Sequence, residues 1–328
     1  MNLRDLVIVG GGPAGLAAAI AAQKAGLDYQ VLEKGVLVNS IFHFPRDMVF
    51  FTTPELLEIG ALPFTTPYQK PTRAEALRYY RRVTDAYQLR VSLGEQVITI
   101  EREKKDVFAI ETRSSNGSRG VHYARTVVMA IGYYDHPNRL EIPGEDLPHV
   151  RHYYSEPHPF YRKQVVIVGG KNSAAEAALE LFRAGAQVTL VHRGSQLGES
   201  IKYWVRPDIE NRIREGSIRG RFDTRVREIR PECVIVESNG NRDELPAQGV
   251  FLLTGYHPDG ELLRRAGVEV NEETFVPTHN PETLETNVPG LYLAGAFVTG
   301  KETNRVFIEN GRFHGDSVVA AIRARLGR

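Results

Sequence analysis

Three glycines and one acidic residue near the N-terminus have the types and spacing needed to hold a dinucleotide. Gly10, Gly12 and Gly15 fill the pattern G-x-G-x-x-G, and Glu33 follows Gly10 by 23 residues. In this pattern the first glycine makes a tight turn, the second lets the backbone approach a pyrophosphate, and the third lets a helix pack close to a sheet. The carboxylate of Glu33 is then expected to bond ribose hydroxyls. The neighbouring residues predicted to complete this site are Pro13, Ala14 and Lys34.

The elements that must position these residues occur twice in the chain. Shifting the sequence by 159 residues aligns Val7–Gly11 with Val166–Gly170, and alanines and glycines further along also coincide. Each copy predicts a buried parallel strand, a glycine turn, a helix and a second strand, which ends near Glu33 in the first copy and near His192 in the second. The repeat therefore predicts two βαβ units, each with its own nucleotide site.

The second copy departs from the first at two places that bear on its ligand. Lys171 and Ala174 replace the second and third glycines, and His192 followed by Arg193 replaces the acidic residue. A carboxylate there would repel a 2′-phosphate, whereas imidazole and guanidinium favour one. We therefore predict FAD in the first site and NADPH in the second; the alternative is that His192 and Arg193 merely cap a surface strand. The residues predicted to bind this nucleotide are Gly169, Gly170, Lys171, Asn172, Ser173, Ala174, His192 and Arg193.

The overall composition excludes several classes of function. Among 328 residues, 41 Lys and Arg balance 40 Asp and Glu, so no excess charge is present to neutralise a nucleic-acid backbone or an acidic membrane surface. The apolar N-terminal stretch is interrupted at Gly10–Pro13, and no other segment is long enough to cross a bilayer. We expect a cytoplasmic protein with no nucleic-acid or membrane partner.

Cysteine usage limits the chemistry further. Cys233 is the only cysteine, so the chain can form neither an internal disulfide nor a CxxC redox pair. It lies in an apolar run that predicts a strand, where a thiol acts as a small hydrophobe. His149, His152 and His158 lack the spacing of a helical zinc pair, so no metal site is predicted.

These motifs, in this order, make the whole chain resemble the two-dinucleotide-binding flavoprotein superfamily, nearest to the low-molecular-weight thioredoxin reductases. The resemblance implies an α/β fold with two Rossmann-type domains, the NADPH domain (154–249) being inserted into an FAD domain formed by 1–153 and 250–328. It also implies homodimers. Further strand ends that the resemblance places at the cofactors are Ile131, Gly132, Gly255, Gly295 and Ala296.

Within that superfamily the chain is most similar to the bacillithiol disulfide reductase type. The similarity rests on Gly169–Ala174, Lys202–Ile213 and Phe307–Gly315. Members of the type carry a cysteine where this chain has Ala14, and thioredoxin reductases carry a ribityl-binding aspartate where this chain has Ala296. The first difference affects disulfide reduction, and the second means that the ribityl hydroxyls must find other partners.

Hydride transfer between the cofactors requires positioning rather than a catalytic side chain, so no catalytic residue is predicted. The resemblance implies a helix N-terminus aimed at the flavin pyrimidine ring. We expect that helix to begin near Thr303, with Asn304, Arg305 and Val306 beside the ring. The segment 42–54 is rich in phenylalanine and either lines the other face of the flavin or packs in the core. Further candidates after Gly132 are Tyr133, Tyr134 and His136.

The function expected from these features is an NADPH-dependent FAD oxidoreductase that passes electrons to a small disulfide, a quinone-like molecule or a partner redox protein. Two alternatives remain open. A flavin-dependent monooxygenase also carries two glycine motifs, and the segment from Ile142 to His149 loosely resembles the linker of that class. A dinucleotide sensor with the same fold but no turnover is the non-enzymatic alternative.

Overall fold

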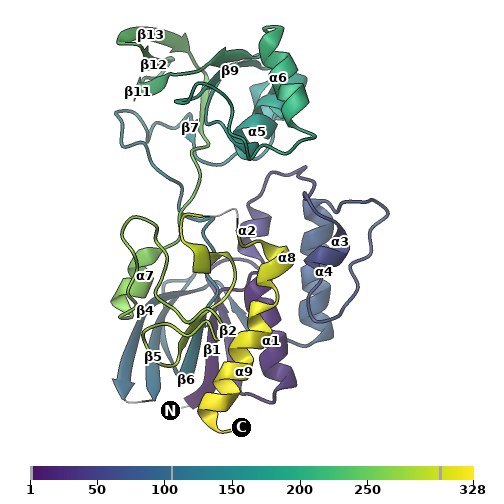
Figure 1. Cartoon of the computed structure of the whole chain (residues 1–328), viewed down its shortest axis with the longest axis vertical. Coiled ribbons are helices and arrows are strands. Elements are labelled where there is room, and N and C mark those ends of the chain that lie inside the picture. The colour runs from purple at the N-terminus through teal and green to yellow at the C-terminus, as the bar shows by residue number, and fades with distance from the viewer. Residues whose placement is uncertain (1–2, 105, 303–304) are drawn as a thin grey trace. The chain divides into compact units, whose positions relative to one another are not determined.

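The chain forms two compact units, one made of residues 1–136 with 256–328 and the other of residues 137–255 (Figure 1). This computed structural model describes residues 3–104, 106–302 and 305–328. The second unit is inserted into the first along the sequence.

The limits of the units differ from the expected boundaries at 153 and 249. The short strand β7 (Val150–Arg151) pairs in parallel with β14 (Gly249–Leu252), which in turn pairs with β8 (Gln164–Val168). Residues 137–153 and 250–255 therefore lie in the second unit, because their backbone groups complete its sheet. This pairing could not be predicted, because β7 is only two residues long and no pattern marks it.

The first unit contains a seven-stranded sheet, in which six strands follow the order β3-β2-β1-β6-β5-β4 and the seventh, β15, pairs with β6. The central strand β1 is buried along its last five residues, as expected for a parallel strand covered on both faces. At its C-terminal end β6 pairs with β15 and with β1, while its first part pairs with β5. The strands are β1 (Leu3–Val9), β2 (Tyr29–Glu33), β3 (Val91–Leu93), β4 (Glu95–Lys104), β5 (Val107–Ser114), β6 (Arg119–Met129) and β15 (Leu291–Leu293).

Helix α1 follows β1 directly and is buried along most of its length. Its alanines allow close packing, and Gly315 at the start of α9 lies against its backbone: a Cβ at Gly315 would fall 2.6 Å from the Ala18 nitrogen. The two helices lie side by side (Figure 1). The α-helices of the unit are α1 (Pro13–Lys24), α2 (Asn39–Phe42), α3 (Pro54–Leu57), α4 (Arg73–Ala86), α7 (Gly260–Arg265), α8 (Ile308–Gly311) and α9 (His314–Leu326), with a 3-10 helix at Ala296–Thr299.

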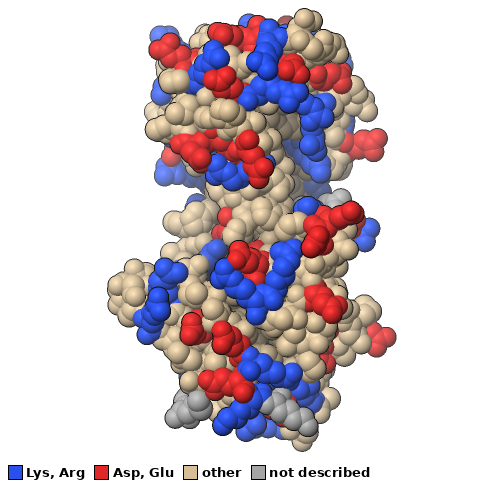
Figure 2. Space-filling model, turned by 90° about the vertical axis from the view of Figure 1, so that its left-hand side faces the viewer, with Lys and Arg blue, Asp and Glu red and all other residues tan. Residues whose placement is uncertain are grey.

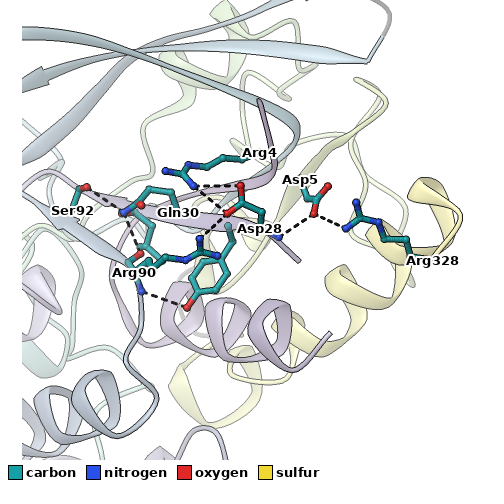
Figure 3. A network of polar contacts seen from close by, with 9 residues as sticks. Arg4, Asp5, Asp28, Gln30, Arg90, Ser92 and Arg328 are labelled. Atoms are coloured by element: carbon teal, nitrogen blue, oxygen red, sulfur yellow. Dashed lines mark hydrogen bonds and ion pairs between the residues drawn. The ribbon is translucent and has the colours of Figure 1, made fainter. Parts of the chain in front are cut away.

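A network of charged side chains closes the sheet at the N-terminal ends of β1 and β2 (Figure 3). Asp28 accepts hydrogen bonds from Arg4 at 3.1 Å and from Arg90 at 2.6 Å. The carboxylate of Asp5 accepts from the backbone N–H of Asp28 at 3.0 Å and from Arg328 at 2.6 Å. This network is at the edge opposite the carboxyl ends of the strands, so it supports the fold and not a ligand site.

The second unit combines a parallel sheet in the order β10-β9-β8-β14-β7 with a three-stranded antiparallel sheet. Helix α5 connects β8 to β9 and buries its alanine-rich face, as the repeat predicted. The remaining elements are β9 (Gln187–Val191), β10 (Arg219–Arg221), β11 (Arg225–Ile229), β12 (Cys233–Ser238), β13 (Asn241–Pro246), α5 (Asn172–Arg183), α6 (Arg206–Arg214) and a 3-10 helix at His158–Phe160.

Neither unit presents a surface of one sign on the face seen in Figure 2, where basic and acidic side chains alternate. The net charge of +1 agrees with this distribution. Within residues 3–104, 106–302 and 305–328, no helix has the length and apolar character needed to span a bilayer.

Candidate functional site

A cavity of about 420 Å³ opens in the first unit at the carboxyl ends of β1, β2, β6 and β15. The chain leaves β1 toward β2 on one side, while β6 lies on the other, and such a switch point is where open α/β sheets bind ligands. The cavity size falls in the range of cofactor sites. Its lining includes the predicted residues Gly10, Gly12, Pro13, Ala14, Glu33, Lys34, Ile131, Gly132, Gly295, Ala296 and Val306.

The three glycines of the first turn serve different purposes. Gly10 has a φ of +109°, and a Cβ there would fall 2.4 Å from the carbonyl oxygen of Ala130, the residue that follows β6. A Cβ on Gly15 would fall 2.0 Å from the carbonyl oxygen of Gly10, so this glycine lets α1 pack on the strand. No atom lies within 4 Å of a Cβ built on Gly12. Packing explains Gly10 and Gly15, whereas Gly12 leaves its space open toward the cavity.

The carboxylate of Glu33 stabilises this turn. Its two oxygens accept hydrogen bonds from the backbone N–H groups of Gly11 at 2.7 Å and Gly35 at 2.8 Å. Burial raises the pKa of Glu33 despite these bonds. Each oxygen keeps a second lone pair, so the carboxylate can still accept from a ribose hydroxyl.

Two charged groups at this end of the cavity were not predicted. Asp135 forms an ion pair with Lys34 at 2.9 Å, so the ammonium of Lys34 already has a partner. Glu95, on β4, accepts from His122 at 2.6 Å and from Thr112 at 2.8 Å. Burial alone would raise the pKa of Glu95, but these bonds outweigh it and the pKa lies below its ordinary value. Glu95 reaches the cavity through an antiparallel strand, and no sequence motif marks that arrangement.

Aromatic side chains line the cavity near the segment 42–54. Phe44 contacts Phe50 and Tyr134 edge-on, with ring centroids 6.3 Å and 5.0 Å apart. Phe42 is exposed and is not part of the lining. Phe50 is buried in the core and also lines the cavity. The other aromatic or imidazole side chains of the lining are Phe51, Tyr133, His136 and Phe307.

The predicted helix start near Thr303 is wrong. Helix α8 begins at Ile308, because the side chain of Asn310 accepts from the N–H of Phe307 and donates to the carbonyl of Arg305, which holds 305–307 in a turn. The guanidinium of Arg305 is exposed, pairs with Glu302 at 2.6 Å and is not in the lining. The predicted residues Thr303 and Asn304 lie outside the described residues.

The glycine turn of the second unit, at Gly169–Ala174, has the same strand-turn-helix arrangement as the turn of the first unit, but different side chains. The ring of His192 lies over Gly170, as Glu33 lies over Gly11: a Cβ on Gly170 would fall 2.4 Å from the imidazole. Burial, followed by the charge of Arg193, lowers the pKa of His192. The imidazole is therefore neutral near pH 7, which makes the exposed Arg193 the permanent cation at this end of the turn.

Asn172, predicted as a cofactor contact, uses its side chain within the protein. Its amide oxygen accepts from the N–H of Lys202 at 2.9 Å, and its amide nitrogen donates to the carbonyl of Ser200 at 2.9 Å. The N–H of Gly198 also donates to the carbonyl of Gly170 at 2.7 Å. The segment 198–202 is thereby fixed beside the start of α5. Lys171 and Ser173 are exposed at this turn, and Ala174 is buried behind it.

Gly255 is the last residue of the second unit, with a φ of +94°. Its carbonyl accepts from the N–H of Asn138 at 2.9 Å.

Cys233 lies on β12 and is partly exposed. The described residues contain no group of His, Cys, Asp and Glu able to hold a metal ion.

Comparisons with known proteins agree with this architecture. Residues 7–295 match the family described as pyridine nucleotide-disulphide oxidoreductase. The chain is 44% identical to bacilliredoxin reductase Bdr of Bacillus subtilis (strain 168) over 97% of each chain. The structure resembles that of bacillithiol disulfide reductase Bdr from Bacillus cereus, with a TM-score of 0.97, 41% identity, and coverage of 99% of this chain and 100% of that one.

A more distant match shows the fold alone. Thioredoxin reductase from T. acidophilum has 21% identity and a TM-score of 0.77, and the match covers both chains completely. The predicted fold class, two Rossmann-type domains of the thioredoxin reductase kind, is confirmed. The chain belongs to the pyridine nucleotide-disulphide oxidoreductase family and is an oxidoreductase that uses FAD and NADPH.

Proposed function

We propose that this protein transfers electrons from NADPH through FAD to an external acceptor, either a low-molecular-weight disulfide of the bacillithiol type or a partner redox protein. The similarity to bacilliredoxin reductase over 97% of the chain supports this acceptor class. It favours a reductase over a monooxygenase and over a sensor without turnover.

The observation that carries the proposal is the composition of the cavity in the first unit. The cavity is lined by the glycine turn, by Ala14 and Glu33 and by aromatic side chains. The resemblance to the bacillithiol type implies a cysteine at the position of Ala14. The only cysteine of the sequence, Cys233, belongs to a strand of the other unit. Direct attack on a disulfide uses a thiolate. The chain's own residues therefore supply a binding site and no thiol relay.

FAD fits the cavity of the first unit. The open space at Gly12 admits a pyrophosphate, and Gly12 caps α1 without a side-chain bond, so the first N–H groups of the helix remain available to phosphate oxygens. Glu33 would bind the adenosine ribose, while Gly295, Ala296 and Val306 would lie along the flavin. FAD, when bound, accepts a hydride and passes the electrons on; the protein holds it and excludes water.

NADPH fits the glycine turn of the second unit. Arg193 would pair with the 2′-phosphate, with the neutral ring of His192 as a hydrogen-bond partner. The N–H groups at the start of α5 would bind the pyrophosphate. Lys171, exposed where the pattern has glycine, would add a cation to the same phosphates. The side chain of Asn172 would act indirectly, by fixing the segment 198–202.

We also propose the homodimer and the cytoplasmic location expected for this type of protein. Light scattering coupled to size-exclusion chromatography tests the first: a mass of twice 36.7 kDa supports it, and a mass of one chain contradicts it.

The acceptor is tested with the purified holoenzyme under anaerobic conditions. NADPH oxidation is measured with bacillithiol disulfide, thioredoxin-like proteins, ferredoxin, flavodoxin and quinones as separate acceptors. Turnover with the disulfide or with one of the redox proteins supports the proposal. Failure of all of these to oxidise the reduced enzyme, or turnover with quinones alone, contradicts it.

The role of position 14 is tested by Ala14→Cys, with Ala14→Ser as the matched control. We expect the cysteine variant to reduce bacillithiol disulfide about tenfold faster or more, because a thiol can form the mixed disulfide that alanine cannot. Flavin reduction by NADPH should stay within about twofold, since that step needs no cysteine. An equal gain with serine would show that the effect does not depend on thiol chemistry.

A further inference from the structure

His314, the first residue of α9, bonds to the wall of the FAD cavity in the first unit. Its Nδ1 accepts a hydrogen bond from the backbone N–H of Gly295 at 3.1 Å. Since an amide N–H can only donate, Nδ1 must be unprotonated, and the neutral ring carries its proton on Nε2. Only the neutral form of His314 can make this bond.

Gly295 has no room to move without disturbing the rest of the wall. It lines the cavity with a φ of +81°, and a Cβ built on it would fall 2.8 Å from the Cβ of Ala14. On its other side, a Cβ built on Gly311 would fall 3.3 Å from the Cα of Gly295. The position of Gly295 thus fixes the distance between the wall and the first turn of α1, where the pyrophosphate of FAD would bind.

His314 is itself held in place by backbone packing. The next residue, Gly315, lies so close to α1 that a Cβ would fall 2.6 Å from the Ala18 nitrogen. The start of α9 therefore cannot shift relative to α1. Because the imidazole is attached to this closely packed backbone, loss of its hydrogen bond leaves the N–H of Gly295 without that support.

We propose that neutral His314 is a positioning residue that holds Gly295 against the glycine turn, and that protonation of His314 loosens this wall and releases FAD. The inference rests on FAD occupying the cavity of the first unit. An imidazolium would turn an Nδ1–H toward the N–H of Gly295, so an acceptor would become a second donor and the bond would be lost.

The surroundings determine the pH at which this occurs. Burial, and then the nearby His279, lower the pKa of His314. The packed face of α1 contributes small residues, Ala17 and Ala18, at this point. The charged neighbours along the chain are turned elsewhere: Arg312 donates to the carbonyls of Glu55 and Glu58, and Asp316 is exposed. We therefore expect the wall to be intact at about pH 6.5, the ordinary value for histidine, and to loosen only at lower pH.

The test measures the FAD retained by the holoenzyme after desalting at a series of pH values, with circular dichroism at each value to exclude unfolding. The wild type should keep its flavin at about pH 6.5 and lose it only at lower pH, because the pKa of His314 is lowered, while its circular dichroism is unchanged. His314→Asn offers an amide oxygen that does not titrate, so it should retain flavin throughout this range. His314→Leu offers no acceptor and should bind FAD about tenfold more weakly at all these pH values.

His279→Asn serves as the matched control, because it removes the neighbouring charge and keeps the bond between His314 and Gly295. The release of flavin should then move to higher pH. A wild type that retains FAD at all these pH values, or a His314→Asn variant that releases it as the wild type does, would overturn the inference. If His314→Leu does not fold, the flavin retention of His314→Asn still tests the inference. A protein without FAD at every pH would instead contradict the proposed function.

Discussion

Gly12 and Gly15 belong to one sequence motif but have different surroundings. The space beside Gly12 is empty in the protein, and its φ of −76° suits any residue. The space beside Gly15 is filled by the carbonyl oxygen of Gly10. At the scale of single residues, Gly12 therefore leaves space for the cofactor, whereas Gly15 is needed for the packing of the fold.

This difference predicts opposite outcomes for two substitutions of the same type. Gly12→Ala should leave the thermal stability of the apoprotein unchanged or slightly raised but weaken FAD binding at least about tenfold, because the methyl group occupies the pyrophosphate's path. Gly15→Ala should destabilise the apoprotein by about 1–3 kcal/mol, because α1 must move away from the strand. Calorimetry of the apoproteins and flavin titration measure the two effects. A similar loss of apoprotein stability in both variants would contradict the assignment.

The residues of the two βαβ turns could be predicted from the sequence because they are local. Turn, helix, second strand and acidic residue follow within 24 residues, from Gly10 to Glu33, and six of the predicted residues between positions 10 and 34 line one cavity. The ion pair of Lys34 with Asp135 could not be predicted, since the partners are far apart in the sequence and no pattern links them. The hydrogen bond from Gly295 to His314 could not be predicted either, because no pattern links these two residues.

Among the elements, the short helices around the cavity were the least predictable. Helices α2 and α3 have four residues each, too few to form without tertiary contacts. Arg73 donates to the carbonyls of Ile41 and Phe42, and Arg312 donates to those of Glu55 and Glu58, 257 and 254 residues away. Side chains from distant parts of the chain thus bond the helix ends, and no local sequence pattern can reveal this. The helix misplaced near Thr303 has a local cause instead, because the side chain of Asn310 bonds Phe307 and Arg305 and thereby determines where the helix starts.

Helix α5 carries an ionisable group whose effect on stability can be measured. Burial, and then the charge of Glu180, raise the pKa of Glu176 to about 7. In the unfolded chain a glutamic acid loses its proton near pH 4.3, so the folded state holds a proton that the unfolded state has released. The contribution of Glu176 to stability is therefore fully present at low pH and is lost as the pH rises toward and through about 7.

Glu176→Gln should remove this dependence. The variant should be as stable as the wild type at about pH 4 and more stable by on the order of 1–3 kcal/mol at about pH 8, because glutamine remains neutral. Thermal unfolding across this pH range measures the difference, with the exposed Glu232→Gln as control. A stability difference that does not change with pH would contradict the raised pKa of the half-buried Glu176.

At the scale of the whole molecule, two units of similar plan carry different chemistry. In each unit a side chain at or directly after the end of the second strand lies over the second residue of the glycine turn, as the carboxylate of Glu33 in the first unit and as the imidazole of His192 in the second. The second unit thereby differs from the first in the charge of the side chain that would face a bound dinucleotide. The composition, with one cysteine outside the cavity, leaves the cofactors as the carriers of electrons.

Anaerobic stopped-flow absorbance of the purified holoenzyme tests the central claim most directly, since it follows the flavin itself. The account predicts one FAD per chain, bleached rapidly by NADPH and at least about tenfold more slowly by NADH at the same concentration, because Arg193 would pair with the 2′-phosphate. A protein that contains no flavin and cannot be reconstituted with FAD, or whose flavin stays oxidised under NADPH, would contradict it.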